Sequence, residues 1–149
     1  MSETVRRRLD ADELLCFAIY SAGHAFNRVY KPLLDALGLT YPQYLVMLAL
    51  WGHDDQTVGG LGEKLFLESS TLTPLIKRLE TMGYVARSRD PADERQVRVR
   101  LTKSGSALRA KASEVPACIL DASGMSVGAL RKLQAEISTL RDNLLKAAS

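Results

Sequence analysis

Residues 84–101 read YVARSRDPADERQVRVRL, and this stretch decides the fold class. In its second half, residues 96–101, apolar and polar side chains alternate with period two, which is typical of a strand with one buried face. Residues 84–89 form a first strand of similar length, and the charged residues 90–95 join the two. The stretch therefore predicts an antiparallel hairpin with a polar tip.

Two short helices are predicted directly before this hairpin. Thr57 is a suitable N-cap for a helix over residues 58–65, although its three glycines each cost about 1 kcal/mol relative to alanine. A polar break at residues 68–70 starts the second helix, which ends at Gly83. Two helices followed by a hairpin are the plan of a winged helix-turn-helix, in which the second helix reads DNA. The apolar stripe of that helix consists of Leu72, Leu75, Ile76, Leu79 and Met82.

The second helix and the hairpin carry the candidate DNA-binding side chains. Hydroxyl groups in the first helical turn suit phosphates and base edges, although hydroxyls also gather at helix starts because they cap well. From Arg87 to Lys103 the sequence has six Lys or Arg against three acids, and a basic ribbon of this kind can enter the minor groove. A ribbon that is merely solvated is the alternative. The candidates are Ser69, Ser70, Thr71, Thr73, Pro74, Lys77, Arg78, Arg89 and Arg95.

Two helices are predicted ahead of this module. Residues 12–36 follow helical spacing, and Pro32 is expected to end or kink the helix just before it. Gly38 is a natural stop. The next helix is capped near Thr40 and runs over about residues 41–51.

Two more helices are predicted after the hairpin. Thr102 caps a helix over about residues 103–120, which Pro116 is expected to bend. Ser126 starts the last helix, whose apolar positions repeat at helical spacing. They are Val127, Leu130, Leu133, Ile137, Leu140 and Leu144.

Length and composition indicate one globular domain. The chain has 149 residues, of which 46% are hydrophobic and 25% charged, and its formal net charge of +3 leans slightly toward polyanions. The loose N-terminal arm contains three consecutive arginines, residues 6–8, which form either a solvated tail or a phosphate-contacting arm. The two cysteines of the chain, Cys16 and Cys118, lack the paired CxxC spacing of a zinc site. We therefore expect no metal and no other cofactor.

The chain shows no targeting or membrane segment. Its first residues contain no apolar stretch of the kind found in signal peptides, and its longest apolar run covers only residues 44–51. A membrane-spanning helix needs about 20 apolar residues. We therefore expect a cytoplasmic protein without membrane contact, in which thiols rest reduced.

The helix and hairpin motifs resemble the multiple-antibiotic-resistance regulator (MarR) family. The resemblance rests on residues 68–80, ESSTLTPLIKRLE, and residues 93–97, DERQV. It implies a mainly α fold with a small β wing, and a homodimer bound to a palindromic operator in double-stranded DNA. Arg95 is then expected in the minor groove, oriented by Asp93. A single domain, 1–149, would place a winged helix-turn-helix at about 40–101 and dimerisation helices at about 10–36 and 103–147.

Three further stretches look like the organic-hydroperoxide-sensing branch of that family. They are residues 15–20, LCFAIY, residues 30–35, YKPLLD, and residues 39–44, LTYPQY. By this resemblance Cys16 is the peroxide-reactive thiol, Tyr30 and Tyr41 hydrogen-bond its sulfur, and Tyr20 lies close by. Cys118 matches the resolving cysteine of two-cysteine members.

The physical chemistry of Cys16 supports this role in part. A thiolate attacks peroxides, and both phenolic donors and a helix N-terminus favour the charged form. Tyr30, however, lies 14 residues after Cys16, or about 21 Å along a straight helix. An antiparallel copy of the helix could supply Tyr30, so we expect the redox site to span the dimer interface. The apolar neighbours of Cys16 suit an organic hydroperoxide better than hydrogen peroxide.

The predicted function is a peroxide-sensing repressor. The reduced dimer binds DNA, peroxide converts Cys16 to a sulfenic acid, and Cys118 of the other subunit condenses with it. The resulting shift would move the recognition helices out of register with the grooves. Other functions stay open: a repressor released by a phenolic or aromatic acid, a thiol peroxidase that uses both cysteines, or an architectural DNA binder. Buried cysteines in apolar helices are also commonly inert.

Overall fold

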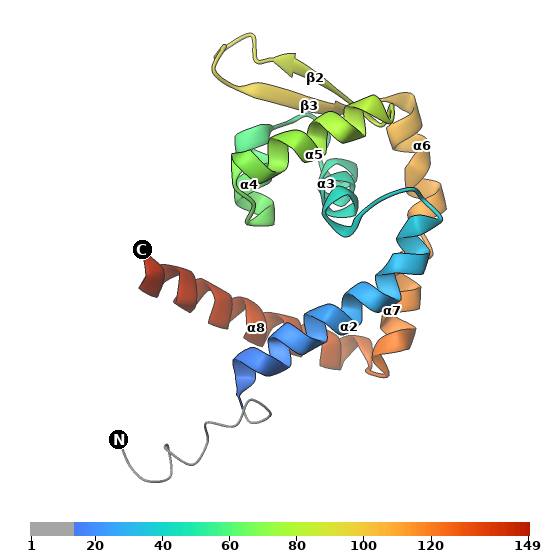
Figure 1. The fold of residues 1–149 in the computed structure, drawn as a ribbon, viewed down its shortest axis with the longest axis vertical. Helices are drawn as coiled ribbons and strands as arrows, with labels where there is room; N and C mark the ends of the chain where they lie inside the picture. The colour runs from blue at the N-terminus through green and yellow to red at the C-terminus, as the bar shows by residue number, and fades with distance from the viewer. Residues whose placement is uncertain (1–13) are drawn as a thin grey trace. The chain divides into compact units, whose positions relative to one another are not determined.

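The computed structural model describes residues 14–149 (Figure 1). The arginine arm at residues 6–8 lies outside the described residues. The chain divides into two compact units, Met1–Ser113 and Glu114–Ser149. No helix among residues 14–149 is long and apolar enough to cross a membrane.

The first unit contains five helices and three strands within its described part. They are α2 (Leu15–Asp35), α3 (Tyr41–Gly52), β1 (Gln56–Thr57), α4 (Val58–Leu65), α5 (Ser69–Thr81), β2 (Val85–Arg89), β3 (Val97–Leu101) and α6 (Lys103–Ala112).

 Within this unit, α4 and α5 form the helix-turn-helix, and β2 and β3 form the hairpin that follows it. The second unit consists of α7 (Val115–Ser123) and α8 (Val127–Ala148).

The sheet is antiparallel, with strand order β1-β3-β2. Val85 pairs with Leu101 and Arg89 with Val97, so the predicted hairpin and its register are confirmed. The sequence did not predict β1, because a two-residue strand is too short to show a period. Its Gln56 pairs with Val99, and this pairing ties the turn before α4 to the wing.

The core lies among α3, α4, α5 and the sheet. In Figure 1, α5 lies between the β2–β3 hairpin and α3, with α4 beside it. The predicted stripe of α5 is only partly right, since Leu75 is half-buried and Met82 follows the end of the helix with 36% of its surface exposed. The largest fully buried side chains are Val46, Met47, Leu50, Leu61, Leu72, Ile76, Leu79, Val85 and Val99.

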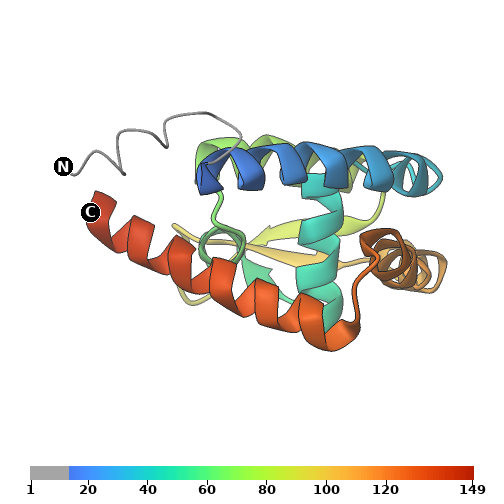
Figure 2. The same cartoon turned by 90° about the horizontal axis from the view of Figure 1, so that it is seen from below.

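Side-chain caps fix the helix starts that the sequence predicts. The hydroxyl of Thr40 accepts a hydrogen bond from the Gln43 N–H, and the Gln43 side chain accepts one from the Thr40 N–H, forming a capping box. Thr57, Thr102 and Ser126 cap α4, α6 and α8 in the same way with one hydroxyl each. Figure 2 shows α3 running at a steep angle to α2, which it follows after the turn at Gly38.

The structure corrects two expectations about proline. Of the two effects expected of Pro32, an end or a kink of the helix, the end is wrong, because α2 continues to Asp35 with only the hydrogen bond to one carbonyl lost. Residues 103–120 are not one bent helix. They form α6 and the start of α7, and Pro116 lies in the first turn of α7, where no intrahelical N–H is needed.

Candidate functional site

Cys16 is the second residue of α2, and its side chain is exposed. Leu14 occupies the N-cap and supplies no side-chain hydrogen bond. The first N–H groups of a helix and its dipole stabilise a nearby anion. The exposed thiol of Cys16 is thus open to a small-molecule oxidant at this end of α2.

A cluster of aromatic rings lies where α2 meets α3. The ring centroids of Tyr30 and Tyr41 are 4.8 Å apart, and those of Tyr30 and Tyr44 are 6.1 Å apart. Burial, followed by the neighbouring phenols of Tyr41 and Tyr44, raises the pKa of Tyr30 to about 12. Burial also raises the pKa of Tyr41 and of Tyr44. All three phenols therefore stay protonated near neutral pH and can donate hydrogen bonds.

One chain does not join Cys16 to these phenols. Both Cys16 and Tyr30 belong to α2, and their 14-residue separation corresponds to about 21 Å of helix. The structure does bring Tyr30 and Tyr41 together, as the predicted site requires. Sequence reasoning missed Tyr44, although it lies three residues after Tyr41 on the same helix and so on a similar face.

A different phenol, that of Tyr20, lies near Cys16 in the same chain. Tyr20 lies one helical turn after Cys16, and its ring meets that of His24 edge to face, with centroids 4.5 Å apart. Tyr20 is 66% exposed. Cys16, Tyr20 and His24 follow each other at intervals of four residues, so they share one face of α2. His24 was not among the predicted residues, and this spacing was the signal that could have found it.

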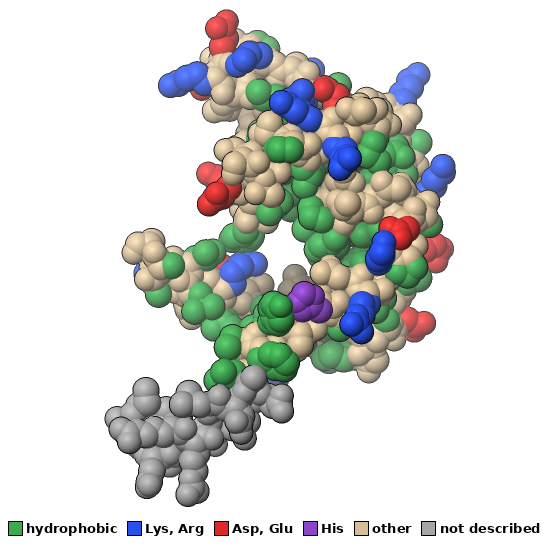
Figure 3. Space-filling view, viewed as in Figure 1, with side chains coloured by type: hydrophobic (Ala, Val, Ile, Leu, Met, Phe, Trp, Pro, Cys, Tyr) green, Lys and Arg blue, Asp and Glu red, His purple; other side chains and the backbone are tan. Residues whose placement is uncertain are grey.

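Cys118 belongs to α7 in the second unit, and it is a half-buried free thiol. The helix after it, α8, has no buried residue within its 22 positions. Its predicted apolar stripe is largely exposed, as are several large side chains of α2 (Figure 3). Exposed apolar faces on neighbouring turns of a helix are typical of protein–protein interfaces. The exposed members include Leu15, Phe17, Ile19 and Phe26 on α2 and Val127, Leu133, Ile137 and Leu144 on α8.

The hydroxyl groups at the start of α5 do not cap it. Glu68 is the N-cap and makes no side-chain cap bond. Ser69, Ser70 and Thr71 are exposed, and within residues 14–149 their hydroxyls make no hydrogen bond. Four other helices of this chain are capped by Ser or Thr, so capping does not explain these residues. This end of α5 can instead donate hydrogen bonds to phosphates and base edges.

Two of the remaining candidates, Thr73 and Arg95, line one cavity. Lys77, Arg78 and Pro74 are exposed on α5, while Thr73 is half-buried and lines a cavity of about 570 Å³ between α4, α5 and the wing. Arg95 lines the same cavity from the wing. Figure 3 shows Lys and Arg side chains projecting from the wing and from α5.

The tip of the wing holds its arginines in place. Arg95 Nε lies 3.2 Å from Asp93 Oδ1, and the same oxygen accepts a hydrogen bond from the Arg95 N–H. The Arg95 side chain is nevertheless 91% exposed. Arg89 donates from Nη1 to the carbonyl oxygen of Glu94 at 2.7 Å, and among the described residues it forms no ion pair.

The wing is less basic than its composition suggests. Arg87 donates from its backbone N–H, Nε and Nη2 to Glu80 of α5, and these bonds hold the pKa of Glu80 below its usual value. Arg98 is bound to Asp55 and Asp90. These two arginines therefore fasten the wing to the helix-turn-helix, so not all six of the cations counted from the sequence are available to DNA.

A comparison with protein families matches residues 28–111 to the model of the transcriptional regulator SarA/Rot. The organic hydroperoxide resistance transcriptional regulator of Bacillus subtilis is 45% identical over 130 residues, which cover 87% of this chain and 88% of that protein. The transcriptional regulator TtmR of Methylorubrum extorquens is 47% identical over 133 residues, which cover 89% of this chain and 68% of that protein.

Among solved structures, reduced AbfR bound to DNA matches with a TM-score of 0.81 and 32% identity, covering 96% of this chain and 99% of that one. Disulfide-formed AbfR matches with a TM-score of 0.63 and 31% identity, covering 98% and 97%. The chain therefore belongs to the MarR family of transcriptional regulators, in the branch of the organic hydroperoxide resistance regulators.

Proposed function

We propose that this protein is a transcriptional repressor that senses organic hydroperoxides. Its reduced homodimer binds a palindromic operator in double-stranded DNA and leaves it when Cys16 is oxidised. One observation carries the proposal: an exposed thiol and a cluster of protonated phenols lie at opposite ends of α2, 14 residues apart. The thiol lacks hydrogen-bond donors for its thiolate form, and the phenols can supply them. A second chain can place the phenols of one subunit beside the thiol of the other.

The homodimer follows from the exposed apolar faces. Large side chains on α2 and α8 stand in solvent in the single chain, and covering them with a second copy would remove apolar surface from water. An antiparallel α2 from the partner would set its Tyr30 and Tyr41 beside Cys16. Their hydroxyls would then stabilise the thiolate by donating hydrogen bonds. The apolar side chains Phe17 and Ile19 around the thiol suit an alkyl or aryl hydroperoxide.

The chemistry takes two steps. The Cys16 thiolate attacks the outer oxygen of the hydroperoxide, the O–O bond breaks, and the alkoxide takes a proton and leaves as the alcohol. Cys16 is then a sulfenic acid. The Cys118 thiol of the other subunit attacks this sulfur and forms a disulfide, and the sulfenic oxygen leaves as water. Two thiols are oxidised and one hydroperoxide is reduced.

Release from DNA follows from geometry. A dimer that reads two half-sites must space its α5 helices to match grooves about 34 Å apart. A disulfide between α2 of one chain and α7 of the other would move these helices away from that spacing. We assign DNA contacts to Ser69, Ser70, Thr71, Thr73, Pro74, Lys77 and Arg78 of α5 and to Arg89 and Arg95 of the wing, with Asp93 orienting Arg95.

We place the protein among regulators and not among enzymes. The relatives it matches are transcriptional regulators. A stoichiometric sensor reacts once for each signal, so it needs no reductant to sustain turnover. A thiol peroxidase would consume many equivalents of hydroperoxide in the presence of a dithiol, and that measurement separates the two functions.

Non-reducing electrophoresis tests the cysteine chemistry. The reduced protein is treated with one equivalent of cumene hydroperoxide, with Cys16→Ser and Cys118→Ser as matched variants. We expect a disulfide-linked dimer for the unaltered protein and a monomer band for both variants. A monomer band for the unaltered protein would exclude the intersubunit disulfide. A dimer band for Cys16→Ser would show that Cys16 is not the reactive thiol.

A further inference from the structure

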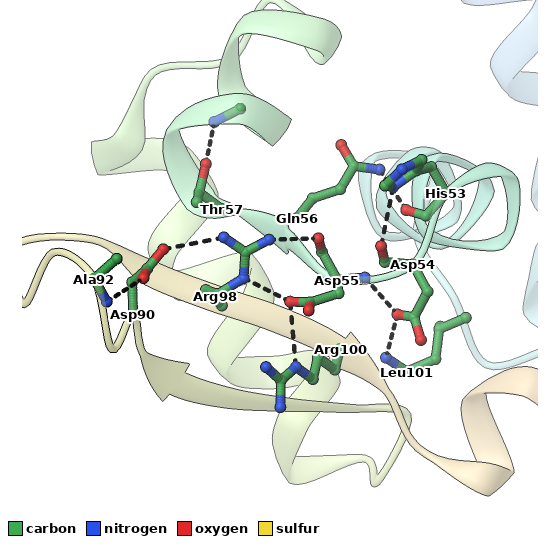
Figure 4. A network of polar contacts seen from close by, with 11 residues as sticks. His53, Asp54, Asp55, Gln56, Thr57, Asp90, Ala92, Arg98, Arg100 and Leu101 are labelled. Carbon is green, nitrogen blue, oxygen red and sulfur yellow. Dashed lines mark hydrogen bonds and ion pairs between the residues drawn. The ribbon is translucent and has the colours of Figure 1, made fainter.

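Arg98 lies in β3, in the middle of the wing, and all its bonds are internal (Figure 4). Its Nε donates to Asp55 Oδ1 at 2.7 Å and its Nη2 to the Asp55 carbonyl oxygen at 2.8 Å. Its Nη1 donates to Asp90 Oδ2 at 3.0 Å. Only 27% of the Arg98 side chain and 13% of the Asp90 side chain are exposed. The guanidinium therefore bridges two carboxylates inside the fold.

The Asp55 end of this bridge is fixed to the helix-turn-helix. Asp55 lies in the turn between α3 and β1, and its φ is +61°. The neighbouring Asp54 Oδ1 accepts hydrogen bonds from the Asp55 N–H at 2.8 Å and the Leu101 N–H at 2.9 Å. Since β1 also pairs with β3, Asp55 is held from both sides (Figure 4).

The Asp90 end leads to the tip of the wing. Asp90 Oδ1 accepts a hydrogen bond from the Ala92 N–H at 2.8 Å, and the Asp90 N–H donates to the Gln96 carbonyl oxygen at 2.9 Å. The Gln96 N–H donates to the carbonyl oxygen of Asp93 at 2.9 Å. Asp93 in turn holds Arg95 through its backbone N–H and its Nε. An unbroken series of hydrogen bonds thus runs from Arg98 to Arg95.

Both carboxylates of the bridge stay charged near neutral pH. Hydrogen bonds from Ala92 and then Arg98 hold the pKa of Asp90 below its usual value. Hydrogen bonds from Arg98 and then Arg100 do the same for the pKa of Asp55. The bridge is therefore an ion pair near neutral pH.

We propose that Arg98 is a positioning residue for DNA binding: it holds the wing tip, and through it Arg95, in the orientation that the minor groove requires. Arg98 itself contacts no DNA. This inference rests on the proposed function, in which Arg95 enters the minor groove. Lysine cannot replace Arg98, because one ammonium on a flexible stem does not span two carboxylates as a planar guanidinium does.

The first test needs no DNA. Amide hydrogen exchange of Ala92 and Gln96 is measured by NMR in the full chain, for Arg98→Lys and for the matched control Arg100→Lys. Arg100 also meets Asp55, at 3.2 Å, but among the described residues it makes no bond to Asp90. We expect exchange at the tip to rise about tenfold in Arg98→Lys and to stay within about twofold in Arg100→Lys. Unchanged exchange in Arg98→Lys would overturn the inference.

The second test measures affinity for a duplex that the unaltered protein selects from a random pool. Arg98→Lys should weaken binding about tenfold, but by less than about twofold when Arg95 is already alanine, because both changes remove the same contact. Affinity equal to that of the unaltered protein, or independent losses in the double variant, would overturn the inference. If the unaltered protein selects no duplex, the proposed function fails, while amide exchange still decides whether Arg98 positions the tip.

Thermal unfolding of each variant precedes both tests. Should Arg98→Lys fail to fold, Asp90→Asn breaks the same bridge from its other end. It keeps an amide oxygen for the Ala92 N–H. The same results are expected from Asp90→Asn. Amide exchange at Gln96 should be faster, and DNA affinity should fall, but this fall should disappear when Arg95 is already alanine. Normal exchange and normal binding in Asp90→Asn would equally contradict the role of the bridge.

Discussion

Tyr30 is a phenol whose acidity is set by burial against Tyr41 and Tyr44. Since its folded-state pKa is raised to about 12, the folded protein keeps the proton that the unfolded chain loses near pH 10. Its contribution to stability is therefore fully present below about pH 10 and is lost as the pH rises through about 12. We expect phenolate absorbance to show a titration step near pH 12 that loses the amplitude of one phenol in Tyr30→Phe and keeps its full amplitude in Tyr20→Phe. An unchanged amplitude in Tyr30→Phe would contradict the assignment.

At the residue scale, the sequence singles out candidate groups but not their contacts. Cys16, Tyr30 and Tyr41 are picked out by the resemblance of their motifs to a family, and their roles stay predictions. The ring contact between Tyr30 and Tyr44 could not, because it depends on how α2 and α3 cross after the turn at Gly38. The inward direction of Arg98 was hidden for a similar reason. Its partner Asp55 is 43 residues away, and alternation along β3 predicts a solvent-facing side chain.

In α4, two glycines of the same short helix should respond to alanine in opposite ways. A Cβ at Gly59 meets no atom within 4 Å, so Gly59→Ala should stabilise the protein by roughly 0.5–1 kcal/mol through backbone entropy. A Cβ at Gly62 would lie 2.7 Å from the Leu67 carbonyl oxygen. Gly62→Ala should therefore destabilise the protein by about 1–3 kcal/mol. Urea unfolding measures both, and a loss at Gly59 or a gain at Gly62 would contradict the packing of α4 against the turn.

At the scale of elements, helix starts were predictable and helix continuations were not. Thr40, Thr57 and Ser126 cap the helices that their sequence patterns predict. Proline was misleading because its effect depends on position. Pro32 sits in the last turn of α2, and Pro116 in the first turn of α7. A periodic apolar stripe does not distinguish one bent helix from two consecutive ones.

For the whole molecule, the exposed stripe of α8 predicts how the protein associates. Ile137, which is 40% exposed, belongs to this stripe, whereas Thr139 lies about 200° further round the helix. Ile137→Asp should weaken dimerisation at least about tenfold, because a buried charge in an apolar interface is costly. Thr139→Asp should leave it unchanged. Sedimentation velocity across a dilution series measures both, and a stable dimer of Ile137→Asp would exclude this face as an interface.

The winged helix-turn-helix was predictable as a whole, because each of its parts has a local signature. Caps mark α4, helical spacing marks α5, and period two marks β3. The redox site has no comparable local signature. Its thiol and its phenols occupy different ends of α2, and only the helical rise of about 1.5 Å per residue indicates that two chains must build it.

The central claim is that oxidation of Cys16 controls DNA binding. Fluorescence anisotropy with a duplex selected by the reduced protein tests it directly, before and after one equivalent of cumene hydroperoxide, for the unaltered protein and for Cys16→Ser. We predict that the unaltered protein loses at least about tenfold in affinity, equivalent to about 1.4 kcal/mol, and that Cys16→Ser keeps its affinity. Release of both proteins, or of neither, would contradict the account.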